Sequence, residues 1–181
     1  MAWLTDTAHT QITFAVKHMM ITTVRGRFES FDVSVNFDEQ NPAQSMVDVQ
    51  IDAASINTKD EKRDAHLRSP DFLHADKFPY LAFRSKRVEV LDSTHARLTG
   101  DLTIRDITKE VVLDVEYAGQ VKNPWGAVSA GFSGRTKLNR KDWNLAWNVA
   151  LEAGGWLVGD EVTIDVEVEL IKQEEAVPVP A

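Results

Sequence analysis

The chain has 181 residues, of which 43% are hydrophobic, with a formal net charge of −8 and no cysteine. This length fits one domain with a substantial core, and the lack of cysteine excludes disulfides, thiolate metal sites and cysteine nucleophiles. The acidic balance argues against binding to nucleic acid or to anionic lipid head groups. No apolar run approaches the roughly 20 residues of a membrane-spanning helix, and residues 1–6 lack the pattern of a signal peptide, which predicts a cytoplasmic protein.

Apolar and polar residues alternate with a period of two along most of the chain. The clearest stretch lies near the end, where Val162, Ile164 and Val166 alternate with Thr163 and Asp165. This pattern is typical of a strand with one buried and one solvated face. It predicts eight strands, at residues 10–20, 24–38, 45–55, 80–91, 96–105, 108–121, 127–139 and 160–172.

Two of these strands change parity midway. In 24–38 the apolar positions shift near Glu29–Ser30, and in 80–91 they shift near Lys86–Arg87. One extra residue resets which face of a strand points inward, so both shifts predict β-bulges.

One helix is predicted, at about residues 59–68, between the third and fourth strands. Thr58 and Glu61 have the spacing of a capping box, with Thr58 as N-cap, and Ser69–Pro70 ends the helix. The segment is polar on nearly every side, so we expect it to cover an end of the fold rather than to enter the core.

Short, turn-rich connections between the strands indicate antiparallel neighbours. The expected fold is all-β, an eight-stranded antiparallel barrel with a short helical insertion between strands 3 and 4. A two-sheet sandwich is the alternative, and the long bulged strands favour the barrel. The domain should span residues 1–172, and the tail 173–181 should be disordered.

Catalytic and metal-binding patterns are not found. The five histidines lack the spacings of a zinc pair, and no serine stands in a nucleophile motif. The sequence therefore predicts no catalytic residue, no metal and no cofactor.

The inward faces of the strands instead predict an apolar lumen. An eight-stranded barrel is either just filled by its side chains or holds one small ligand. Small inward residues such as Gly26, Ala130 and Gly134 leave room for a mostly apolar ligand. The predicted lining residues are Phe14, Val16, Phe28, Phe31, Val49, Ile51, Phe83, Leu102, Ile104, Leu113, Phe132 and Leu138.

A basic cluster in the predicted helix is a local exception in an acidic chain. Arg63, His66 and Arg68 are candidates for contacting a polar or anionic head group at the barrel end. The alternative is an ordinary solvated helix face, because acidic residues are interleaved with the basic ones.

Several motifs, in order along the chain, resemble one known family. They are Trp3…Asp6-Thr7-Ala8-His9-Thr10…Val24-Arg25-Gly26-Arg27-Phe28, then Arg63-Asp64-Ala65-His66-Leu67-Arg68-Ser69-Pro70-Asp71-Phe72, then Gly100-Asp101-Leu102-Thr103-Ile104-Arg105, Asn139-Arg140 and Gly159-Asp160-Glu161-Val162. Over residues 3–171 the chain resembles the YceI-like, or polyisoprenoid-binding, family. Trp143–Asn144 depart from its expected Phe-Gly, and Asp106 and Glu110 from an expected glycine and proline.

The resemblance implies a lipocalin-like barrel around an apolar tunnel that binds a polyisoprenoid, an isoprenoid quinone or another long-chain lipid. It also implies carriage or sequestration of that lipid without catalysis. Two alternatives stay open: an enzyme acting on a prenyl or quinone substrate, with His18 as its inward ionisable group, and a ligand-free structural module related to stress. A homodimer through the barrel rim or an outer sheet face is also possible.

Overall fold

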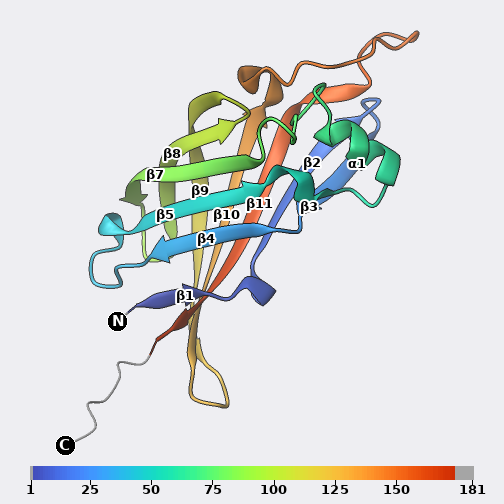
Figure 1. Ribbon diagram of the computed structural model, residues 1–181. Helices are drawn as coiled ribbons and strands as arrows, with labels where there is room; N and C mark the ends of the chain where they lie inside the picture. Colours follow the sequence, from blue (N-terminus) through green and yellow to red (C-terminus); the bar gives the residue numbers. More distant parts are fainter. Residues whose placement is uncertain (1, 174–181) are drawn as a thin grey trace, which may run out of the picture.

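The computed structural model describes residues 2–173, and nearly all of its regular structure is β-strand (Figure 1). The strands are β1 (Trp3–Thr5), β2 (Gln11–His18), β3 (Thr22–Phe28), β4 (Phe31–Asn36), β5 (Met46–Asp52), β6 (Ile56–Asn57), β7 (Tyr80–Val90), β8 (His95–Ile104), β9 (Ile107–Lys122), β10 (Val128–Asn139) and β11 (Val158–Lys172). The helix is α1 (Glu61–Arg68), and the short 3-10 helices are η1 (Thr7–His9), η2 (Pro42–Gln44), η3 (Ala53–Ser55) and η4 (Arg140–Trp143). Most of the expected C-terminal tail, residues 174–181, lies outside the described residues.

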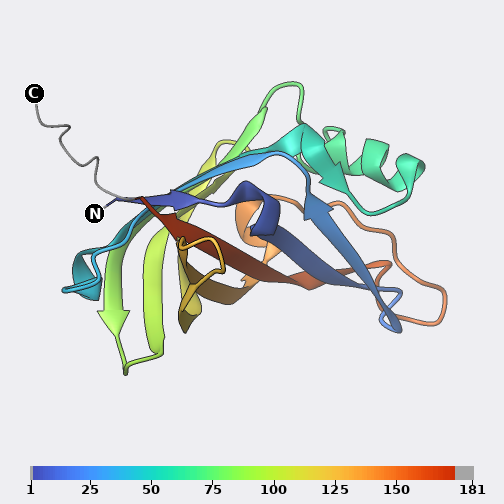
Figure 2. The ribbon, with the colours of Figure 1, turned by 90° about the horizontal axis from the view of Figure 1, so that it is seen from below.

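The strands form one curled antiparallel sheet. Its order is β4-β5-β7-β8-β9-β10-β11-β2-β3-β6, and β1 pairs with β11 outside this path. Figure 2 shows the curl, which brings the first and last strands of the sheet toward each other. β1 helps to close the remaining gap, because it pairs with β11 while the Thr5 hydroxyl donates to the Val33 carbonyl of β4 at 2.6 Å. The prediction of an all-β antiparallel barrel with a helical insertion is confirmed.

The structure has eleven strands where the sequence predicts eight. β1 and β6 are too short to show a two-residue period, and the predicted strand 24–38 is divided into β3 and β4. At Glu29–Ser30 the chain does more than bulge, because β3 pairs with β2 and β6 whereas β4 pairs with β5. The parity shift there marks a corner at which the chain changes its neighbours.

The second predicted bulge is confirmed in β7. The pairing of β7 with β8 shifts register between Ser85 and Arg87. On one side of the shift Phe83 lies opposite Leu102, and on the other Val88 lies opposite Leu98. The extra residue therefore keeps apolar side chains on the inner face along the whole strand.

The predicted cap of α1 is wrong, although the helix ends at Arg68 as expected. Asp60 is the N-cap, and its carboxylate accepts from the Arg63 amide at 3.1 Å. Lys59 has a left-handed φ of 62°, which turns the chain just before the helix and takes Thr58 out of capping position. Thr58 is buried instead, and its hydroxyl donates to Asp64 at 2.6 Å.

Candidate binding cavity

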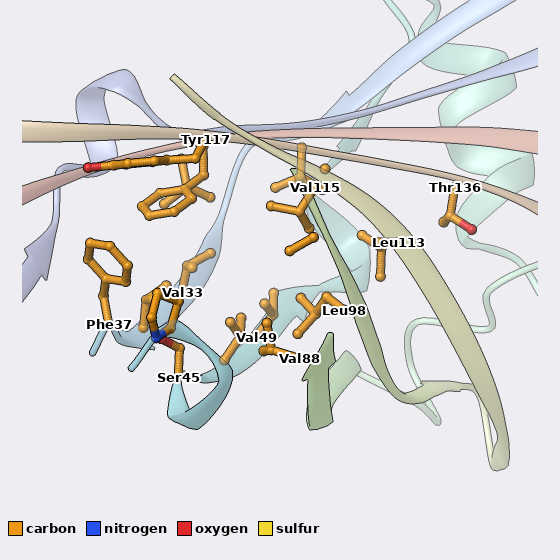
Figure 3. Close-up of a pocket in the computed structure, with 18 of the residues that line it drawn as sticks. Val33, Phe37, Ser45, Val49, Val88, Leu98, Leu113, Val115, Tyr117 and Thr136 are labelled. Atoms are coloured by element: carbon orange, nitrogen blue, oxygen red, sulfur yellow. The ribbon is translucent and has the colours of Figure 1, made fainter. Parts of the chain in front are cut away.

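A cavity of about 510 Å³ lies between β4, β5, β7 and β8 on one side and β9, β10 and β11 on the other (Figure 3). This volume falls within the roughly 300–1,000 Å³ typical of small-molecule sites. Strand alternation builds it: in β5, Val47 and Val49 line the cavity while Asp48 and Gln50 are exposed. The wall is aliphatic and aromatic except at the rim and at the Thr136 hydroxyl.

Small residues keep the middle of the cavity open. Ala96, Val115, Gly134 and Val166 lie side by side across β8, β9, β10 and β11, and all four line the cavity. A Cβ atom on Gly134 would lie 3.4 Å from a methyl carbon of Leu113, which is ordinary contact. A larger side chain at Gly134 would therefore extend into the open space.

The cavity reaches solvent at a polar rim. The rim consists of exposed or half-buried lining residues: Glu39, Pro42 and Ser45 between β4 and β5; Asp92, Ser93, Thr94 and His95 at the turn from β7 into β8; and Gln120 near the end of β9. Gln120 donates to Glu39 at 2.8 Å, and Lys172 pairs with the other Glu39 oxygen at 3.0 Å. These two hydrogen bonds, with that from Gln120 first, lower the pKa of Glu39.

A second rim carboxylate, Asp92, organises the turn between β7 and β8. It accepts from the backbone amides of Thr94 and His95, each at 2.8 Å. The bond from Thr94, followed by that from the His95 side chain, lowers the pKa of Asp92 to about 2. The rim thus presents two ionised carboxylates at neutral pH.

The opposite end of the barrel is packed shut. Trp143 of η4 is 2% exposed, and its indole nitrogen donates to the Leu102 carbonyl at 3.0 Å. Arg140, also buried, donates to four backbone carbonyls of the segment that leads into β11, those of Leu145, Trp147, Val158 and Gly159. Burial lowers the pKa of the Arg140 guanidinium, and Asp160 opposes that shift. These four hydrogen bonds from Arg140, called the Arg140 clasp below, hold the irregular segment 144–157 over the closed end.

The predicted lining residues divide between the two ends. Seven of them line the cavity: Val49, Ile51, Phe83, Leu102, Leu113, Phe132 and Leu138. The other five do not: Phe28 and Ile104 are core residues, Phe14 and Phe31 pack against that core, and Val16 pairs with Val24 in β3. All five lie at the packed end or in the sheet beside it.

The predicted head-group residues lie on α1, and none of them lines the cavity. Arg63 donates to the side chain and carbonyl of Thr58, at 2.7 and 2.8 Å. His66 bonds Asp71 at 2.9 Å, with its ring edge-on to Trp147, and Arg68 donates to the Ala54 carbonyl. His18 is not a lining residue either.

The sequence reasoning missed the rim, because loop residues carry no periodic signal. It also left out Val33, Ile164 and Val166, although their alternation placed them on apolar faces. Aromatic packing beside the rim was missed too: Phe37 lies edge-on to Phe132 at 5.0 Å, and Tyr117 stacks on Phe132 at 5.0 Å.

The spacing of the histidines in the sequence also gave no sign of one cluster of metal-ligand-type side chains, which lies outside the cavity. Asp6, His9 and Glu169 bring ligand-type atoms within 4.8 Å of one another. The His9 ring bonds Asp6 at 2.8 Å, and this bond raises the pKa of His9 and lowers that of Asp6. The hydrogen bond between His9 and Asp6 stabilises η1, which lies beside β11.

Comparison with known proteins places this architecture in a family. The family model for the YceI-like domain matches residues 3–170. A UPF0312 protein of Staphylococcus aureus strain N315 is 38% identical over 165 residues, which cover 91% of this chain and 94% of the relative. A UPF0312 protein of Photorhabdus laumondii is 41% identical over 137 residues, covering 76% and 71% of the two chains. The chain therefore belongs to the YceI-like family.

Solved structures support the same fold. A YCEI protein of Campylobacter jejuni superposes with a TM-score of 0.74 at 32% identity, covering 96% of this chain and 99% of the other. BcnA of Burkholderia cenocepacia gives 0.79 at 24% identity, with 92% and 99% covered. A polyisoprenoid binding domain of Saccharophagus degradans gives 0.63 at 11% identity, with 95% and 99% covered. Within residues 2–173, no helix is both long and apolar enough to cross a membrane.

Proposed function

We propose that this protein binds one long-chain amphiphilic lipid, of the polyisoprenoid or isoprenoid quinone type, and carries or sequesters it without catalysis. The observation that carries the proposal is the 510 Å³ cavity with an apolar wall and a polar rim. Membership of the YceI-like family supports it, as does the fold shared with a polyisoprenoid binding domain. Burial of about ten CH₂ groups would contribute roughly 8 kcal/mol before the cost of association.

The chain of the ligand would lie along the aliphatic wall, with its polar end at the rim. Glu39 and Asp92, both ionised there, would repel a diphosphate and favour an uncharged hydroxyl or quinone oxygen. The Ser93 hydroxyl and the second amide N–H of Gln120, beside the one that donates to Glu39, offer hydrogen-bond donors for such an oxygen. Arg63 and Arg68, which the sequence offered for this role, already donate to Thr58 and Ala54. We therefore assign the head group to the rim.

The arrangement of ionisable groups supports carriage over catalysis. Among the described lining residues, Glu39, Asp92 and His95 stand at the rim and Tyr117 lies just inside it. The deeper wall offers the Thr136 hydroxyl, which Figure 3 shows beyond Leu113 from the rim residue Ser45 and from Phe37 beside it. A lone hydroxyl in an apolar wall can accept or donate a hydrogen bond, but it lacks the adjacent base that a nucleophile needs.

Native mass spectrometry of delipidated protein tests the proposal directly. The protein should retain one equivalent of a long-chain polyprenol or prenyl quinone, and retain a prenyl diphosphate of equal length less well. Gly134→Phe should weaken binding at least about tenfold, because the ring occupies the space in which the chain would lie. Ser133→Phe is the matched control, since Ser133 is the exposed neighbour on the same strand.

Three outcomes would contradict the proposal. A barrel that stays empty when lipid is supplied would favour the ligand-free structural module. Equal lipid binding by Gly134→Phe and Ser133→Phe would show that the lipid does not bind in the cavity. Turnover of a prenyl substrate that is lost in His18→Ala, with binding retained, would favour the enzyme. A cytoplasmic location and a homodimer remain predictions that cell fractionation and light scattering check.

A further inference from the structure

The hairpin between β9 and β10 extends beyond the rest of the barrel at the rim (Figure 1). β8 begins opposite Glu116, so residues 117–122 of β9 have no β8 partner. At roughly 3.3 Å per residue, the hairpin reaches about 20 Å past the end of β8. Gly119 has a φ of 96°, and the register shifts between Gly131 and Phe132, so the hairpin bends where it leaves the barrel.

The tip of this hairpin is apolar and exposed. Trp125 is 88% exposed and Val121 is 69% exposed. Lys122 is the one charged residue in 118–128, in a chain with a net charge of −8. A solvated loop in an acidic protein would be expected to carry more charge, so the composition indicates contact with an apolar or interfacial environment.

The apolar surface continues from the hairpin across the outer face of the sheet. Val121 lies opposite Ser129, Ser129 opposite Ile171, and Ile171 opposite Leu4, which is 54% exposed. The base of the hairpin is bound to the cavity rim, because Gln120 lines the cavity and donates to Glu39. The exposed tip and the cavity opening are thus parts of one end of the molecule.

We propose that the tip surface, made of Leu4, Val121, Trp125 and Ile171, docks on an uncharged lipid bilayer surface, from which the cavity takes or to which it returns its lipid. This inference rests on the proposed function, since a long-chain lipid resides in a membrane when it is not bound. The indole ring of tryptophan has an apolar body and a polar N–H, which suits the boundary between head groups and acyl chains. The aliphatic stem of Lys122 can lie along that boundary with its charge in water.

The size of the surface argues against a second copy of this chain as the occupant. One aromatic side chain buries at most roughly 250 Å². A standard protein interface buries roughly 800 Å² on each partner. Two side chains on the hairpin, Val121 and Trp125, and two at its base, Leu4 and Ile171, supply too little area for that, whereas insertion into a bilayer surface needs only the tip.

A second exposed apolar group provides the internal control. Trp156, 52% exposed, belongs to the connection that leads into β11, next to Gly155, which Met20 approaches closely. Trp125 precedes β10, and β10 and β11 are antiparallel, so the two tryptophans lie at opposite ends of the sheet. Neither Trp156 nor residues 19–21 line the cavity.

Flotation of the delipidated full-length protein with phosphatidylcholine vesicles tests the inference. The wild-type protein should float with the vesicles, with little dependence on salt, and added anionic lipid should weaken binding because the chain is acidic. Trp125→Ala should lower the partition coefficient at least about tenfold, because binding scales with the apolar area inserted. Trp125→Phe should retain part of the binding, and Trp156→Ala should match the wild type.

The inference is overturned if Trp125→Ala floats like the wild type, if Trp156→Ala loses binding, or if Trp125→Ala alters the oligomeric state instead. A water-soluble fluorescent probe with a short prenyl chain and an uncharged hydroxyl head group, titrated without vesicles, separates this inference from the proposed function. Probe binding without vesicle binding would support the proposed function of the cavity and contradict the proposed docking surface. Vesicle binding without probe binding removes the cavity function.

Discussion

The two ends of this barrel share the same alternation of apolar and polar residues along their strands, but one end is packed and the other is open. At the closed end, inward side chains such as Phe28 and Ile104 pack into a continuous core. At the rim end, inward side chains such as Val47, Val49 and Val115 border an open cavity. Alternation alone does not explain the difference, because apolar residues alternate with polar ones at both ends.

The residues that fill the closed end come from outside the sheet. Leu73, Ala75, Trp143 and Leu145 all belong to connections, and all are buried in the main core. The connections at the rim are polar and exposed, and contribute Glu39, Ser45 and Asp92. Strand pattern therefore decides which side chains point inward, whereas the size of those side chains, as at Gly134, and the connections together decide whether the interior is filled.

Removal of Trp143 should have the largest effect on stability. Trp143→Ala deletes a side chain that is 2% exposed, together with its hydrogen bond to Leu102, and should lower the free energy of unfolding by about 3–5 kcal/mol. Denaturant titration measures this, and ligand stoichiometry in the folded protein should be unchanged. Trp125→Ala is the matched control and should change stability by no more than about 0.5 kcal/mol. Equal effects of the two substitutions would contradict the division into a packed and an open end.

The Arg140 clasp should have the next largest effect. Arg140→Ala removes the guanidinium donor from four backbone carbonyls, of which that of Val158 keeps its bond from Asn148, and should cost about 3 kcal/mol. Hydrogen exchange should rise across residues 145–158, with little change at the rim turn. Lys141→Ala is the control, because Lys141 is exposed and makes only a 3.2 Å pair with Asp160, worth about 1 kcal/mol or less. Unchanged exchange in Arg140→Ala would show that the segment is held by other contacts.

Much of the fold could be predicted because strands report their exposed and buried faces residue by residue. The period-two pattern located the long strands, and the parity shift located the bulge between Ser85 and Arg87. The shift in the apolar pattern could not distinguish a bulge from the corner at Glu29–Ser30, since both change which set of alternate residues points inward. The cap at Asp60 was missed because Thr58 has the capping-box spacing, and only the turn at Lys59 removes it from the helix.

The cavity was less predictable than the fold. Phe14 and Phe83 both follow the inward pattern, yet Phe14 packs against Phe28 at 5.7 Å between ring centroids, while Phe83 lines the cavity. Which of the two is a lining residue depends on distant connections such as η4. The rim combines two loops with Gln120 of β9, and these meet only in the folded protein. The basic residues of α1 are close together in the sequence and therefore gave the stronger sequence signal.

The smallest predicted effect is a local pH response of the rim. The pKa of Asp92 is lowered to about 2, so its ionised form stabilises the turn above its ordinary pKa of 3.8, and that contribution is lost as the pH falls from about 4 toward 2. Because Asp92 is exposed, the effect should be confined to the turn. The protection factor of the Thr94 amide, which compares its exchange rate with that of an unstructured peptide at the same pH, should fall over this range in the wild type. Asp92→Asn should lower this protection factor already at pH 5. Asp106→Asn, in the β8–β9 turn at the other end of β8, should leave Thr94 unchanged. A pH-independent protection factor at Thr94 would mean that the rim is held by the Gln120–Glu39–Lys172 bonds rather than by Asp92.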